Sequence, residues 1–98
     1  MIELPEIIAF DWDDGNRLKS RKHGVLQSEA EEVFFNQPLL LVDLGHSERE
    51  PRYHALGETR SGRRLHITYT LRRNCSLIRV ISARDMHRKE RAFYDQAD

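Results

Sequence analysis

The sequence predicts an α+β fold with a largely antiparallel sheet, and three observations support this prediction. Three alternating apolar segments between residues 52 and 82 are separated by short turns, as in an antiparallel meander. Two segments with helix-start signals precede the meander at residues 13–34. An arginine-rich helical segment follows it. Because helices and strands are grouped in this way, we expect an α+β domain.

The chain length suits one domain with a single core, so residues 1–98 are assigned to one domain. The composition is 39% hydrophobic and 33% charged, which is typical of a soluble globular protein. The longest apolar run, at residues 39–42, is far shorter than the roughly 20 residues of a membrane span. The first residues also lack a basic signal-peptide segment. We therefore expect a cytoplasmic protein that has no membrane partner.

The first elements are predicted from alternation and helix capping. Residues 7–12 alternate well enough to form a first strand. Residues 13–15 then start a short helix that runs to about Lys22, and Gly24 ends it. Basic residues fill the last turn of this helix. They stabilise its negative end, which explains them without any further function.

A second helix is predicted to begin at a capping-box pattern formed by Ser28 and Glu31. Apolar residues recur along it at helical spacing. The apolar segment at residues 39–43 is a strand candidate, and the polar segment at residues 44–51 is an exposed loop.

The three strands of the meander are expected at residues 52–59, 64–72 and 76–82. The middle strand alternates cleanly, so one face belongs to the core and we expect the other to be solvated. The core-facing residues of this strand are Leu65, Ile67, Tyr69 and Leu71.

The last strand is predicted to end at Ser82, because Ser82 and Asp85 form another capping-box pattern. A C-terminal helix would begin there. Arg84 in its first turn would oppose the helix dipole, a placement that suits a bound anion such as phosphate. Glu90 would face the edge of the core and need a partner there.

Charge is unevenly distributed, although the formal net charge is zero. Residues 1–59 contain 6 Lys/Arg against 12 Asp/Glu, whereas residues 60–91 contain 10 against 2. This division indicates either a polyanionic or acidic partner at the basic segment, or ion pairs between the two segments within the fold. The sequence leaves both interpretations open.

The sequence offers no support for metal-dependent or serine-based catalysis. Its single cysteine, Cys75, is expected in a turn, and the five histidines show no spacing typical of metal ligands. No serine lies in a nucleophile-elbow motif. We therefore expect neither a metal ion nor another cofactor.

The remaining polar side chains suit RNA cleavage without a metal. Attack by the 2′-hydroxyl of RNA requires a base, cations for the charge on the phosphorane, and an acid for the leaving oxygen. Arginine suits the stabilisation of charge, and histidine suits proton transfer. Residue chemistry alone supports nucleic-acid binding and goes no further. The candidates are Lys19, Lys22, His23, Arg64, Arg79, Arg84, Glu90, Arg91 and Tyr94.

Five short motifs occur along the chain: FDWD (Phe10–Asp13), KHGV (Lys22–Val25), EAEEVF (Glu29–Phe34), ISAR (Ile81–Arg84) and ERAFY (Glu90–Tyr94). In this order they resemble the BrnT family of bacterial toxins. The resemblance implies a fold similar to the RelE-type ribonuclease toxins, and RNA cleavage that needs no metal cofactor and inhibits translation. It also implies a BrnA-type antitoxin, a ribbon-helix-helix protein that covers the toxin and represses their operon, so the toxin meets DNA only through the antitoxin.

Carried over by position, the resemblance implies one set of functional residues. We hypothesise that His23 is the acid or base, that Lys22 and Arg84 bind phosphate, and that Arg91 supports charge stabilisation. Glu90 would orient an arginine or act as a base. The residues carried over are Trp12, Lys22, His23, Arg84, Glu90, Arg91 and Tyr94.

A second set of residues is expected to bind the RNA. Lys19, Arg64 and Arg79 would contact the backbone, and aromatic rings would stack on bases. Trp12 and Tyr94 are the aromatic candidates, although such residues more often belong to the core.

The chain departs from the family pattern at Asn16 and Ser20, where relatives often carry lysine and asparagine. The helix should tolerate both changes. An alternative function is a non-catalytic module that binds the antitoxin and modulates operon repression. Proximity of Lys22 and His23 to Arg84 in the fold would favour catalysis over this alternative.

Overall fold

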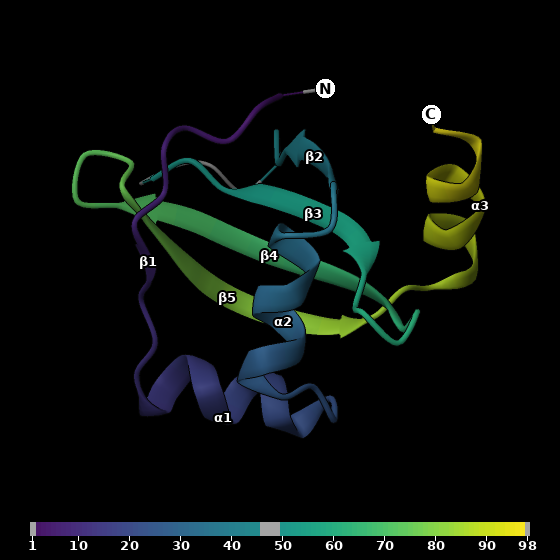
Figure 1. Ribbon diagram of the computed structural model, residues 1–98, viewed down its shortest axis with the longest axis horizontal. Helices are drawn as coiled ribbons and strands as arrows, with labels where there is room; N and C mark the ends of the chain where they lie inside the picture. The colour runs from purple at the N-terminus through teal and green to yellow at the C-terminus, as the bar shows by residue number, and fades with distance from the viewer. Residues whose placement is uncertain (1, 46–49, 98) are drawn as a thin grey trace.

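The computed structural model describes residues 2–45 and 50–97, which form a five-stranded sheet with helices on both faces (Figure 1). The strand order is β1-β5-β4-β3-β2. β1 runs parallel to β5, and the other pairs are antiparallel. The predicted α+β class and the largely antiparallel sheet are therefore confirmed. The elements are β1 (Ala9–Phe10), α1 (Asp14–Lys22), α2 (Gln27–Phe34), β2 (Leu39–Val42), β3 (Tyr53–Glu58), β4 (Arg64–Arg72), β5 (Leu77–Asp85) and α3 (Arg88–Gln96).

The main core lies between the sheet and the two N-terminal helices, and β4 supplies its centre. Leu65, Ile67 and Tyr69 are all buried, as their alternation predicted. Phe34 of α2 meets Tyr69 edge to face, with 5.1 Å between the ring centroids. Burial of such side chains stabilises the fold at about 25 cal/mol per Å² of apolar surface.

α1 has the caps that the sequence predicted, and it packs against β5. Asp13 accepts the backbone N–H of Asn16, and the Asn16 side chain accepts the backbone N–H of Asp13. The amide of Asn16 also donates to the carbonyl of Val80 (2.8 Å). Gly24 follows the helix with φ +72°, a conformation that favours glycine. Asn16 and Ser20 are both buried, so neither belongs to the exposed face of α1.

The predicted start of the C-terminal helix is wrong. β5 continues to Asp85, which pairs with Leu65 of β4, and α3 begins only at Arg88. The hydrogen bonds of this register outweigh the local capping signal of Ser82. Arg84 therefore lies in a strand and not in a first helical turn. The cap of α3 comes instead from Glu90, which accepts the backbone N–H of His87 (2.8 Å).

Two other predicted boundaries need correction. α2 begins at Gln27, because Glu29 accepts the backbone N–H of Leu26 (3.0 Å), so the predicted Ser28–Glu31 cap is wrong. The side chain of Glu31 accepts a hydrogen bond from Trp12 instead. The first strand is also shorter than residues 7–12, since only Ala9 and Phe10 pair with β5.

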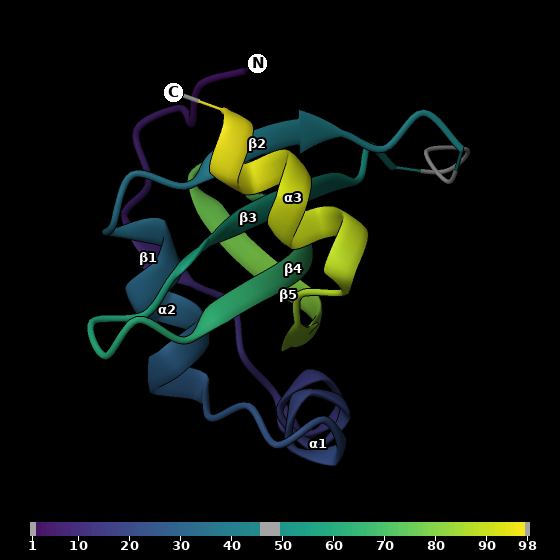
Figure 2. The same cartoon turned by 90° about the vertical axis from the view of Figure 1, so that its right-hand side faces the viewer.

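The second face of the sheet is covered by α3, whereas we expected this face to be solvated (Figure 2). A small apolar cluster of Leu39, Leu56 and Met86 lies under the helix. None of the described residues of α3 is buried, so apolar packing holds this helix only weakly. Polar side chains fill most of the remaining contact, and they form the candidate site.

Ion pairs within the fold account for part of the uneven charge distribution between the acidic and basic segments. Arg63 pairs with Glu29 (3.2 Å), and Arg79 pairs with Asp13 (2.9 Å). Cys75 is exposed in the β4–β5 turn, as predicted. Within the described ranges, no helix combines the length and apolar character needed to cross a membrane.

Candidate functional site

Arg84 and Glu90 form a bidentate ion pair between the end of β5 and the first turn of α3. Nη1 of Arg84 lies 2.8 Å from Oε1 of Glu90, and Nη2 lies 2.9 Å from Oε2. Nη1 also donates to the carbonyl of Asp85 (3.1 Å). These bonds use both N–H groups of Nη1 and one of Nη2. The N–H groups that remain, on Nε and Nη2, lie on one edge of the guanidinium and have no partner among the described residues.

Glu90 has the partner that its position required. Burial alone would raise its pKa, but hydrogen bonds from Arg84 and from the backbone N–H of His87 lower the pKa of Glu90 to about 2. The carboxylate is therefore ionised at neutral pH. Because it is fixed by three donors, it fixes the orientation of Arg84 in turn.

His66 of β4 stands behind this pair. Its Nδ1 lies 2.9 Å from Oε2 of Glu90, and its Nε2 lies 2.9 Å from Nδ1 of His54 on β3. Burial lowers the pKa of His66 to about 4, even though Glu90 favours the charged form. The ring is therefore neutral at pH 7.

His54 continues the chain of polar contacts across the sheet. Its Nδ1 is 3.1 Å from Oγ1 of Thr68, and its Nε2 is 3.1 Å from Oδ2 of Asp43, just beyond β2. The contacts thus run from Asp43 through both histidines to Glu90 and Arg84. We call this the histidine chain, and it connects β3, β4, β5 and the residue after β2 with α3.

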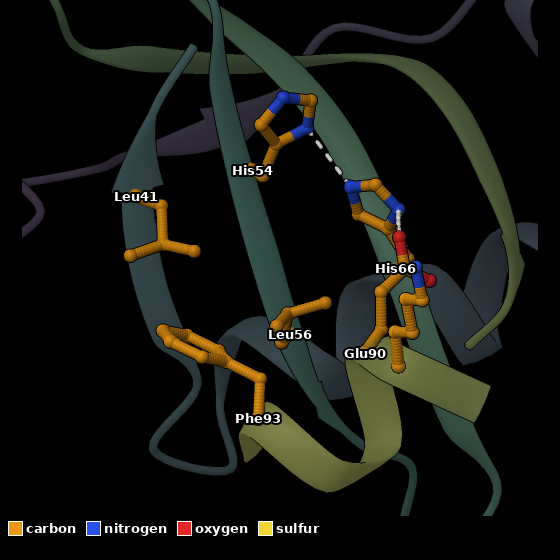
Figure 3. A pocket seen from close by; sticks show the side chains of 7 residues that line it. Leu41, His54, Leu56, His66, Glu90 and Phe93 are labelled. Atoms are coloured by element: carbon orange, nitrogen blue, oxygen red, sulfur yellow. Dashed lines mark hydrogen bonds and ion pairs between the residues drawn. The ribbon is translucent and has the colours of Figure 1, made fainter. Parts of the chain in front are cut away.

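The histidine chain forms one wall of a pocket of about 430 Å³ between α3 and the sheet (Figure 3). Most of the pocket surface is apolar, and Phe93 at its mouth is 51% exposed. An apolar cavity with a few convergent polar groups is typical of a ligand site. The lining residues are Leu41, His54, Leu56, His66, Lys89, Glu90 and Phe93.

Lys19, Lys22 and His23 lie at the end of α1 and are exposed. Their side chains make no hydrogen bond or ion pair within the part of the chain that the structure describes. They are therefore available to an anionic ligand.

Arg63 connects the end of α1 to the end of β5. Its Nη1 donates to the carbonyl of Gly24 (2.8 Å), and its Nε and Nη2 donate to the carboxylate of Asp85 (2.8 and 3.1 Å). The hydrogen bonds to Asp85, together with those to Glu29, raise the pKa of Arg63. The guanidinium of Arg63 therefore contacts both Gly24, which follows His23, and Asp85, which follows Arg84.

The two groups of predicted catalytic residues do not touch each other. Successive strand residues face opposite sides of a sheet, so Arg84 faces α3 while Asp85 faces Arg63. No hydrogen bond or ion pair between described residues joins Lys22 or His23 to Arg84. The groups lie at the same end of the sheet but on different faces.

Arg64 holds α3 against the sheet, and Arg91 fixes the segment that leads into the helix. Nη1 of Arg91 donates to the carbonyl of Met86 (2.9 Å). Arg64 pairs with Asp95 (2.9 Å) and lies over the ring of Tyr94, 5.9 Å from its centroid.

Two of the predicted RNA-binding residues lie near the start of α1 and are already bound to acidic side chains. Nε1 of Trp12 donates to Glu31 (2.8 Å). Arg79 pairs with Asp11 and with Asp13. All of these contacts contribute to stability, so the predicted RNA contacts of Trp12, Arg64, Arg79 and Tyr94 stay predictions.

Sequence reasoning did not single out His54 and His66. The alternation of the middle strand placed His66 on its polar face, and this position was the signal that could have identified His66. The strand register was needed to bring His54 next to it, because His66 pairs with Leu56 and His54 with Thr68. Among the described residues, no three His, Cys, Asp or Glu side chains are arranged to hold a metal ion.

The sequence also matches a known protein family. Residues 12–90 fit the family model described as the ribonuclease toxin BrnT of type II toxin–antitoxin systems. The chain belongs to the BrnT family. The match includes α1, the whole meander, Arg84 and Glu90. A comparison with curated proteins gives no significant match.

Membership of the BrnT family confirms the resemblance that the motifs indicated. The family is one of ribonuclease toxins, so the class of activity is RNA cleavage. A type II toxin acts with an antitoxin, so the BrnT chain has an antitoxin partner. The arrangement around Arg84 can now be considered with this chemistry in view.

Proposed function

We propose that this BrnT chain is an endoribonuclease that cleaves RNA without a metal ion, through attack of a 2′-hydroxyl on the adjacent phosphate. The Arg84–Glu90 pair carries the proposal. Glu90 occupies one side of the guanidinium and leaves the Nε and Nη2 edge available. Two N–H groups on one edge match two phosphate oxygens, as in bidentate arginine–phosphate pairs.

An arginine that is already oriented stabilises developing charge without having to reorganise. The phosphorane carries more negative charge than the starting phosphodiester, and a fixed donor edge favours it over the ground state. Removal of one such donor typically costs about 10²–10³ in rate. Arg84 thus supplies the charge stabilisation that a metal ion provides in other nucleases.

The end of α1 supplies the remaining cations. A single strand of RNA that passes around the end of β5 reaches both Arg84 on one face and Lys22 on the other. In this arrangement Lys19, Lys22 and His23 bind neighbouring phosphates, and water supplies the proton for the leaving 5′-oxygen. Arg63 supports the arrangement because it ties Gly24 to Asp85.

Arg91 contributes indirectly in this proposal. Its bond to the carbonyl of Met86 fixes the segment between β5 and α3. That segment carries Arg84 at one end and Glu90 at the other, so its geometry sets the geometry of the ion pair.

The cellular part of the proposal follows from family membership. We propose that the protein acts in the cytoplasm, that RNA cleavage inhibits translation, and that its antitoxin is a ribbon-helix-helix protein of the BrnA type. Expression of the chain alone should then arrest protein synthesis. Co-expression of a ribbon-helix-helix protein encoded beside it should restore synthesis, and failure to do so would contradict this antitoxin class.

Cleavage of total RNA in excess EDTA, by protein freed of antitoxin, tests the catalytic proposal. The parent should cleave, and Arg84→Ala should lose about 10²–10³ in rate. Arg73→Ala is the matched control, because Arg73 is an exposed arginine in the distant β4–β5 turn. Cleavage that requires an added metal, or full cleavage by Arg84→Ala, would contradict the proposal.

One observation favours a second candidate function. Because Lys22 and His23 do not contact Arg84, the chain also fits a non-catalytic module that binds the antitoxin and modulates repression. This candidate predicts tight antitoxin binding and no cleavage by the parent on free RNA or on ribosome-bound RNA.

A further inference from the structure

His66 has an unusual hydrogen-bonding position for a side chain in the interior of the site. Its side chain is only 13% exposed, and Nδ1 is buried 2.9 Å from Oε2 of Glu90. Nδ1 is nevertheless a buried nitrogen without a hydrogen-bond partner in the described part of the chain, although Oε2 lies close enough to share a proton with it. A buried ring nitrogen of this kind normally has such a partner.

Counting protons along the histidine chain explains this nitrogen. Three contacts join Asp43 to His54, His54 to His66, and His66 to Glu90. An imidazole ring that carries no charge has a single N–H group. If His54 donates to Asp43 and His66 donates to His54, then Nδ1 of His66 carries a lone pair that faces a carboxylate. The chain is one proton short of completing all three contacts.

A ligand can approach this proton-accepting position only through Glu90, because Nδ1 itself is buried whereas the half-buried Glu90 lines the pocket. Glu90 and His66 share one wall, and Leu56 and Phe93 offer apolar surface opposite them (Figure 3). A ribose and its base can occupy such a pocket, with the base against Phe93. Arg84 lies just beyond Glu90, where the adjacent phosphate would lie.

We propose that Glu90 and His66 together form the general base of the RNA cleavage described above, an assignment that rests on the proposed function. The O–H bond of the 2′-hydroxyl breaks, and its proton moves to Oε2 of Glu90 and then to Nδ1 of His66. The oxygen electron pair forms the O2′–P bond as the P–O5′ bond breaks. A water molecule supplies the proton for O5′, and the hydroxide that remains takes the proton from His66, which returns the base to its starting state.

Proton transfer to His66 relieves an unfavourable contact and creates a favourable one. The imidazolium donates from Nδ1 to Glu90 and from Nε2 to His54, so all three contacts of the chain acquire a proton. Glu90 alone is a poor base because Arg84 stabilises its charge. His66 gives the proton a second position, 2.9 Å away.

The pH dependence of cleavage distinguishes this base from an exposed histidine. The charged and titratable groups around His66 are Glu90, His87 and Lys89 from the α3 segment, Arg84 from β5, and His54 with Asp43 behind it. Burial lowers the pKa of His66 to about 4, so its base form persists far below neutral pH. An exposed histidine loses its base form near pH 6.5.

Single-turnover cleavage of a short RNA between pH 3.5 and 8 in EDTA, with circular dichroism at each pH, tests the assignment. The parent rate should fall on the acid side near pH 4. His66→Gln should lose about 10²–10⁴ in rate and lose this acid limb. Arg73→Ala should match the parent at every pH.

Glu90→Gln provides the second variant. It should be slow as well, and the double variant His66→Gln/Glu90→Gln should lose no more than the slower single variant, because the two groups act as one unit. If each substitution instead damaged the structure independently, the two losses in rate would multiply in the double variant. If thermal unfolding shows that His66→Gln is not folded, the acid limb of the parent's pH–rate profile and the cleavage rate of Glu90→Gln test the assignment instead.

Three results would overturn the assignment while leaving the proposed function intact: a full cleavage rate in His66→Gln, a parent acid limb near pH 6.5, or multiplying losses in the double variant. Absence of cleavage by the parent would instead overturn the proposed function, and this assignment with it.

Discussion

The two faces of the sheet differ in what holds their helices in place. On the face covered by α1 and α2, α2 packs through apolar side chains, and residues such as Val33 and Ile67 are completely buried. On the face covered by α3, the apolar cluster is small, and the histidine chain and the Arg84–Glu90 pair supply most of the contact. One face supplies stability, whereas the other concentrates polar groups whose protonation and charge can serve a reaction.

The division is visible in two adjacent residues of β4. Ile67 is fully buried on the face of α2, and His66 contacts Glu90 on the face of α3. A single strand thus serves both faces because its side chains alternate. Substitutions on the two faces should therefore separate stability from activity.

The largest effect on stability is expected from Ile67→Ala. Truncation of this buried side chain leaves a cavity, and the free energy of unfolding should fall by about 2–5 kcal/mol. Urea unfolding at pH 7 measures the change. The cleavage rate per folded molecule should stay close to that of the parent, and a large loss of that rate would break the division between the faces.

The acid dependence of stability should depend on Glu90. Its pKa is about 2 in the fold, against 4.5 for an ordinary glutamate. Because the folded pKa is lowered, the stability that the ionised carboxylate contributes is complete above about pH 4.5 and is lost as the pH falls towards 2. Glu90→Gln should flatten the dependence of unfolding free energy on pH in this window. Glu6→Gln, at an exposed position, should retain the parental slope.

A smaller loss of stability is expected from Trp12→Phe. Phenylalanine retains the aromatic packing but cannot donate to Glu31, and loss of this hydrogen bond to a charged group should cost about 1–2 kcal/mol. Urea unfolding measures the loss. Because Phe keeps a ring that can stack on a base, cleavage should be unaffected, and a stability equal to that of the parent would contradict the structural role of the bond.

The smallest effect on stability is expected from Phe93→Ala, since this side chain is 51% exposed. The free energy of unfolding should stay within about 0.5 kcal/mol of the parent. RNA affinity should fall roughly 5-fold to 150-fold, which corresponds to the about 1–3 kcal/mol of a base stacked on an aromatic ring. Titration with a short RNA measures this affinity, and unchanged binding would remove the pocket from the RNA site.

Much of the fold could be predicted because its signals are local. The Asp13 cap, the turn at Gly24 and the alternation of Leu65, Ile67 and Tyr69 each depend on a few neighbouring residues. The boundary at Ser82 could not be predicted in the same way. Its capping pattern is also local, but the pairing of Asp85 with Leu65 extends the strand, and that pairing depends on the register of the whole meander.

The candidate site was less predictable than the fold. Arg84 and Glu90 could be selected from the motifs, and the need of Glu90 for a partner followed from its spacing in the helix. The contribution of His54 and His66 could not be seen, since the histidine chain joins β3, β4 and α3 through contacts that no sequence spacing encodes. Sites assembled across several elements become visible only when the strand register is known.

Metal-free RNA cleavage by Arg84→Lys, beside the parent and with unfolding free energies measured on the same samples, tests the central claim most directly. Lysine keeps the positive charge for Glu90 but lacks a planar edge with two donors. The claim predicts a cleavage rate at least about tenfold below the parent, in line with the typical worth of an oriented donor, in a variant that remains folded. Cleavage at the parental rate would contradict the claim, because a point charge alone would then be sufficient.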